Sequence, residues 1–126
     1  MKIQQEHVIQ SVCNALQYIS YYHAPDFIRS MTHAYEKETH QSAKNAIAQI
    51  LINSKMSALG QRPMCQDTGI VNVFVEVGMD VTWEAELSLE DMINEGVRQA
   101  YTSSDNPLRA SIVEDPLFAR TNTKDN

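Results

Sequence analysis

The sequence predicts an α+β fold that is mostly helical, with a small sheet built around a strand at about residues 70–77. Two observations support this prediction. Apolar residues recur at helical spacing through most of residues 3–60, and the period then changes from 3.6 to 2 at Ile70. The 126 residues are enough for one domain.

Three amphipathic helices are predicted in the first half of the chain, at residues 3–20, 25–39 and 42–60. Pro25 suits the start of the second helix, because its fixed φ angle matches a first helical turn. Gly60 is expected to end the third helix in a left-handed conformation. The apolar stripe of the first helix consists of Val8, Ile9, Val12, Cys13, Leu16 and Ile19.

The strand at residues 70–77 is predicted from alternating side chains. One face carries Val71, Val73, Val75 and Val77, and the other carries Ile70, Asn72, Phe74 and Glu76. The residues "GMD" that follow can turn the chain into a short partner strand around Trp83, which would complete a hairpin.

A fourth helix is predicted from Ser88 to about Tyr101. Ser88 is a favourable N-cap, and Asp91 three residues later gives a variant of the capping box. Pro107 then favours an extended chain, so "LRASIV" at residues 108–113 is predicted as a further strand that carries Arg109. The polar tail after it has no apolar face to bury.

The composition excludes several classes of protein. Sixteen acidic and ten basic residues give a formal charge of −6 without a basic cluster, which argues against a nucleic-acid partner. No apolar run approaches the roughly 20 residues of a membrane span, and the first residues lack a secretory signal. We therefore expect a cytoplasmic protein without a membrane partner.

The two cysteines lie in different settings. Cys13 falls on the apolar stripe of the first helix, so a buried structural thiol is expected there. Cys65 falls in a polar turn between a helix and a strand, where ligands are often bound. Two cysteines cannot form a dense disulfide framework, which favours a reducing compartment. The four histidines show no short metal-ligand spacing with either thiol, so surface or capping roles are expected for them.

Taken alone, the residues from Cys65 to Gly69 are more typical of an ordinary turn than of a functional site, since Asp67, Thr68 and Gly69 are common turn residues. The full string "MCQDTG", running into a valine-rich strand, resembles the cluster-binding segment of the class I fumarate hydratases, which are iron-sulfur hydro-lyases. The segments "EGVRQAY" and "LRASIVEDPLFARTNTKDN" are also similar to this family. The resemblance covers about residues 60–126.

The resemblance implies a 4Fe-4S cluster held by three cysteines, and reversible hydration of fumarate to (S)-malate. Cys65 matches the first cluster ligand, and Gln66 and Asp67 match residues that contact the substrate. Asp67 would transfer a proton, and Arg109 resembles the arginine that binds a substrate carboxylate. Arg98 or Arg120 could instead hold that place. A mid-helix position makes Arg98 more typical of a solvated salt bridge.

Only one of the three expected cluster cysteines is present. We therefore expect residues 1–126 to be the amino-terminal part of a truncated α domain, inactive and without its cluster when isolated. The expected partners are the rest of the α domain, a β domain or subunit, a second copy in a homodimer, and a small dicarboxylate. Two alternatives remain open: the α subunit of an L(+)-tartrate dehydratase, or a non-catalytic helical interaction module.

Overall fold

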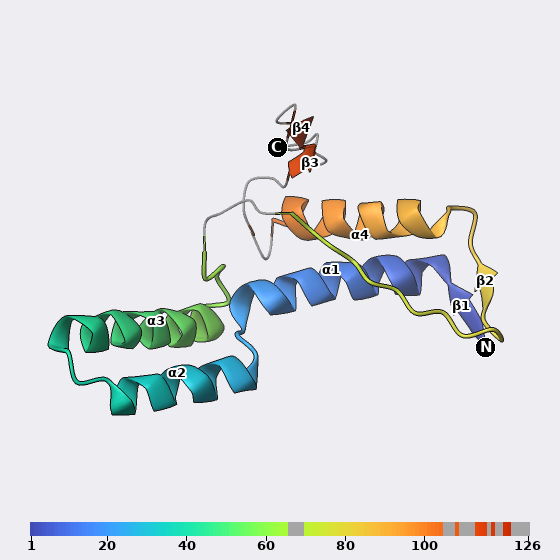
Figure 1. Cartoon of the computed structure of the whole chain (residues 1–126). Helices are drawn as coiled ribbons and strands as arrows, with labels where there is room; N and C mark the ends of the chain where they lie inside the picture. Colours follow the sequence, from blue (N-terminus) through green and yellow to red (C-terminus); the bar gives the residue numbers. More distant parts are fainter. Residues whose placement is uncertain (66–69, 105–107, 109–112, 116, 118–119, 122–126) are drawn as a thin grey trace. The chain divides into compact units, whose positions relative to one another are not determined.

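The computed structural model describes residues 1–65, 70–104, 108, 113–115, 117 and 120–121 (Figure 1). The chain divides into two compact units. The first unit comprises residues 1–17 and 66–126, and the second comprises residues 18–65. Among the described residues, none of the helices combines the length and the apolar character needed to cross a membrane.

A two-stranded parallel sheet lies in the first unit. Strand β1 (Lys2–Gln4) pairs with strand β2 (Thr82–Glu84), with Ile3 opposite Trp83. The first residue extends this pairing, because the Met1 amino group donates to the carbonyl of Asp80 at 2.8 Å. The Met1 carbonyl in turn accepts from the Thr82 N–H at 2.9 Å. The sheet therefore joins two segments that are far apart in the sequence.

Helix α1 (Gln5–Tyr21) contributes residues 5–17 to the first unit, where they pack with helix α4 (Leu89–Thr102). The two helices approach each other closely at Gly96, where a Cβ atom would lie 2.6 Å from the carbonyl oxygen of Ile9. The buried cluster consists of Cys13, Leu16, Val97, Ala100 and Tyr101. Cys13 is thus confirmed as a core residue, and its burial raises the pKa of its thiol.

Helix α4 begins as the sequence predicts. The Ser88 hydroxyl accepts a hydrogen bond from the Asp91 N–H at 3.1 Å and donates one to the Asp91 carboxylate at 2.7 Å. The chain just before this cap is tied to α1, because the Gln5 side-chain oxygen accepts from the N–H groups of Glu86 and Leu87. Local capping and one long-range contact therefore fix the start of α4.

The second unit is a pair of helices, α2 (Pro25–Lys37) and α3 (Gln41–Gly60), together with the last residues of α1. The two helices pack against each other. The predicted left-handed position is wrong by one residue: Gln61 has φ 46°, whereas Gly60 is still helical. The cap N–H of Gln61 donates to the Ser57 carbonyl, and this bond closes the last turn in place of a glycine.

The mostly helical α+β class is confirmed, but the position of the sheet is not. Residues 70–77 form no strand, and β2 pairs with β1 instead of forming a hairpin. The physical reason is that alternating apolar and polar side chains suit the two faces of a strand but do not by themselves form one. A β-strand also needs a second strand whose backbone hydrogen-bonds with it. Residues 70–77 have no such partner in the described part of the chain.

A second, antiparallel pair joins β3 (Val113–Asp115) and β4 (Arg120–Thr121). The strand predicted at residues 108–113 falls mostly outside the described residues, and only Val113 of that range lies in β3.

Candidate functional site

The segment before Cys65 is held at both of its backbone polar groups. The Met64 N–H donates to the Ser20 carbonyl at 3.0 Å, and the Met64 carbonyl accepts from the Asn53 side-chain amide at 2.9 Å. Backbone groups paired in this way cannot move without losing two hydrogen bonds. The residue next to Cys65 therefore has a defined position in the second unit.

The turn between α3 and this segment is closed by Ser57. Its carbonyl accepts from the Arg62 N–H at 3.2 Å, and its hydroxyl donates to the Arg62 carbonyl. Ser57 is buried, so these bonds are shielded from water. Ser20, Asn53 and Ser57 are supporting residues that periodicity and motifs do not reveal, since each acts on a segment at least five positions away.

The Cys65 thiol is exposed, in contrast to that of Cys13. An exposed thiol on a fixed backbone can become a thiolate ligand without the cost of burying an unpaired charge. Within the described ranges, no three His, Cys, Asp or Glu side chains gather to hold a metal ion. Cys65 thus fits the part of one ligand to an iron-sulfur cluster, and the described residues do not provide the others.

The other predicted site residues, Gln66, Asp67 and Arg109, lie outside the described residues. Their roles therefore stay predictions. Of the two alternatives to Arg109, Arg120 lies in β4, and Arg98 lies in α4.

Arg98 is confirmed as a salt-bridge residue. Its Nε and Nη2 atoms donate to the two carboxylate oxygens of Glu95, both at 2.8 Å. These hydrogen bonds, with a third from Gln99, lower the pKa of Glu95 from 4.5 to about 2. A guanidinium committed to Glu95 in this bidentate way is a poorer candidate for a substrate carboxylate than Arg109.

His23 has a role that the sequence did not predict. Its Nδ1 atom lies 3.0 Å from the Ser54 hydroxyl, and its ring stacks on Phe27 at a centroid distance of 4.3 Å. The pair borders a hollow of about 270 Å³ whose described lining contains no carboxylate: Tyr22, His23, Ile28, Leu51, Ser54, Lys55 and Ala58. Without an acidic group to orient the imidazole, we assign this pair to packing between the start of α2 and α3.

The comparisons with known proteins identify the family. A family model described as Fumarate hydratase (Fumerase) matches residues 9–126. A protein of Methanocaldococcus jannaschii named "Putative L(+)-tartrate dehydratase subunit alpha" is 35% identical over 101 residues. That match covers 80% of this chain but 34% of the relative, so the chain spans about a third of the relative's length. The match over nearly the whole chain shows that this protein belongs to the fumarate hydratase (Fumerase) family.

Proposed function

We propose that residues 1–126 are the amino-terminal part of the α domain of an iron-sulfur hydro-lyase that reversibly hydrates fumarate to (S)-malate. The observation that supports this proposal most is the family match along residues 9–126, which includes Cys65 and the residues that follow it. The exposed thiol of Cys65, next to a segment held at both backbone groups, adds a physical argument.

Cys65 is the residue that would hold a 4Fe-4S cluster, as one of its thiolate ligands. When bound, such a cluster supplies a Lewis-acidic iron that can polarise a hydroxyl and a carboxylate of the substrate. The remaining thiolates come from polypeptide outside the described residues. The 126-residue chain by itself is therefore expected to carry no stable cluster and to be inactive.

The residues after Cys65 would act on the substrate directly. Gln66 can donate or accept a hydrogen bond at a substrate carboxylate or hydroxyl. Asp67 would exchange the proton on the carbon next to the hydroxyl-bearing carbon, which requires a carboxylate with a pKa tuned by its site. Arg109 would bind one end of the dicarboxylate through the two parallel N–H groups of its guanidinium.

The complete enzyme would need partners and a reducing environment. We propose the rest of the α domain and a β domain or subunit as partners, with the whole assembled as a homodimer. A thiolate ligand requires Cys65 to stay reduced, which fits a cytoplasmic location.

L(+)-tartrate is the second candidate substrate, because the relative from M. jannaschii carries the name of a tartrate dehydratase α subunit. Fumarate hydration and tartrate dehydration make the same chemical demands, namely a Lewis acid for a hydroxyl, a proton-transfer group and cations for two carboxylates. (S)-Malate and L(+)-tartrate differ by one hydroxyl group. Residues that contact this hydroxyl would decide the specificity.

The experiment compares kcat/KM of the complete, anaerobically reconstituted enzyme for fumarate, (S)-malate and L(+)-tartrate. We expect turnover of fumarate and (S)-malate at least about tenfold above that of tartrate, equivalent to about 1.4 kcal/mol in transition-state binding. A preference for tartrate would select the second candidate. A cluster-loaded enzyme that converts none of the three would contradict the hydro-lyase proposal.

A further inference from the structure

Residues 70–77 carry the pattern of a strand but have no strand beside them. In the described part of the chain, their backbone N–H and C=O groups form no hydrogen bond, and the nearest backbone bond is that of the Val81 N–H to the Gly78 carbonyl. Figure 1 draws the segment as a continuous, uncoiled trace. Its backbone is therefore available for pairing along its length.

The two faces of this segment differ in their surroundings. Val73, Val75 and Val77 border a groove in the first unit, yet each remains roughly half exposed. Phe74 does not line this groove and is 96% exposed. Covering a large apolar side chain of this kind is favourable, so the exposed segment indicates a surface that another polypeptide covers.

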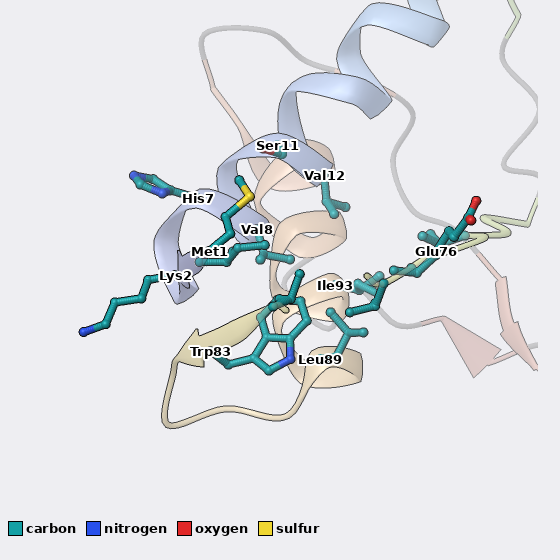
Figure 2. A pocket seen from close by; sticks show the side chains of 15 residues that line it. Met1, Lys2, His7, Val8, Ser11, Val12, Glu76, Trp83, Leu89 and Ile93 are labelled. Atoms are coloured by element: carbon teal, nitrogen blue, oxygen red, sulfur yellow. The ribbon is translucent and has the colours of Figure 1, made fainter. Parts of the chain in front are cut away.

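The groove beside the valines has a volume of about 390 Å³ and apolar walls. Figure 2 shows Val8 and Val12 of α1, Trp83 of β2, and Leu89 and Ile93 of α4 around it. The charged ends of Lys2 and Glu76 point away from its centre (Figure 2). The valines border this groove without filling it, and a second strand beside residues 70–77 would place its own apolar side chains in the remaining space.

We propose that a β-strand from the polypeptide beyond residues 1–126 pairs with residues 70–77 and covers this groove. The chemistry of the partner is specific: a strand with apolar residues at alternate positions and no charge on the face toward the groove. We assign this strand to polypeptide outside residues 1–126 because of the length of the relative. The match covers 34% of the M. jannaschii protein, so about two thirds of a polypeptide of that length lies outside the matched region. The proposed strand pairing rests on the proposed function in one respect only: both treat this chain as part of a longer polypeptide.

A second copy of this chain is a less suitable occupant. Antiparallel pairing of two copies through residues 70–77 would bring the helices α1 and α4 of both copies into one layer. Each copy already has these helices directly below the segment, as the shared lining of the groove shows. A single added strand would pair with the segment without bringing a second pair of helices beside it.

Hydrogen exchange tests the pairing directly. The first sample is the 126-residue chain, and the second is a chimera in which this chain replaces the matched part of the M. jannaschii relative. We expect alternate amides of residues 71–77, those that point to the paired edge, to exchange at least about 100-fold more slowly in the chimera. The amides of α1 and α4 should stay protected in both samples. In case the chimera does not fold, the chain is mixed with the relative's polypeptide lacking the matched part, and the same protection is expected.

Proline variants test whether the backbone pairs. Val73→Pro and Phe74→Pro remove N–H groups that point to opposite edges of the segment, so one of them should lower the unfolding temperature of the chimera. Neither should lower that of the isolated chain, and Met79→Pro, beyond the segment, serves as the matched control in both.

Fast exchange of residues 71–77 in both the chimera and the mixture would overturn the proposal. So would protection in the isolated chain accompanied by dimer formation in sedimentation, which would assign the surface to a second copy. Protection without hydro-lyase activity would instead count against the proposed function alone.

Discussion

Replacing Gly96 by alanine should destabilise the contact between α1 and α4. A Cβ atom at this position would lie 2.6 Å from the Ile9 carbonyl oxygen, and 2.8 Å and 3.0 Å from two side-chain carbons of Val12. The oxygen belongs to the backbone of a helix and cannot rotate away. The two helices must therefore separate, or α1 must distort, to accept one methyl group.

The size of the effect follows from two opposing contributions. Overpacking in a close contact costs about 1–3 kcal/mol, and the backbone oxygen places this case in the upper part, at about 2–3 kcal/mol. Alanine is a better helix former than glycine and returns about 1 kcal/mol. The Gly96→Ala variant should therefore lose about 1–2 kcal/mol of unfolding free energy.

Urea unfolding monitored by circular dichroism measures this loss as a lower midpoint with an unchanged m value. Gly78→Ala is the matched control, because a Cβ atom there would meet nothing within 4 Å. The control should be neutral or gain up to about 1 kcal/mol. If the two variants were equally stable, the close packing of α1 against α4 at Gly96 would be refuted.

Four further variants test the ion pair and the candidate site. Because the folded pKa of Glu95 is about 2 and lies below its ordinary 4.5, the stabilisation from the pair with Arg98 is complete above pH 4.5 and is lost as the pH falls toward 2. Glu95→Gln should thus lose at most about 1 kcal/mol at neutral pH and approach the wild type near pH 2 in acid unfolding curves, with a smaller difference at high salt. In the complete enzyme, Asp67→Asn should lower turnover by about 10²- to 10⁴-fold at unchanged iron content. Arg109→Lys should mainly weaken dicarboxylate binding, seen as a higher KM; an unchanged KM would point away from Arg109. Asn53→Ala removes one anchor of the segment before the cysteine and should cost about 1 kcal/mol in unfolding free energy, together with lower cluster occupancy measured by iron analysis.

The helices could be predicted from the sequence because their signals are local. Apolar periodicity together with the start signals at Pro25 and Ser88 placed the four predicted helices to within two or three residues, and the Ser88 cap was confirmed in its hydrogen bonds. The same local reasoning failed at residues 70–77, where alternation was present but the partner strand was not. It also missed the pairing of β1 with β2, because this pairing joins residues about 80 positions apart in the chain.

The candidate site shows the same division. The contrast between a buried Cys13 and an exposed Cys65 could be predicted from the polarity of their neighbours. The anchoring of Met64 by Ser20 and Asn53 could not, because these hydrogen bonds join separate segments and leave no periodic pattern.

The most direct test of Cys65 as a cluster ligand compares Cys65→Ser with Cys13→Ser in the complete, anaerobically reconstituted enzyme. Iron content and the visible absorbance of the cluster are measured for each variant, with unfolding curves as a check on the fold. We expect Cys65→Ser to abolish the absorbance with little change in stability, because the Cys65 side chain is exposed. Cys13→Ser should keep the absorbance and lose stability, because it places a hydroxyl in the buried cluster between α1 and α4. Retention of the cluster in Cys65→Ser, or equal loss in both variants, would contradict the assignment.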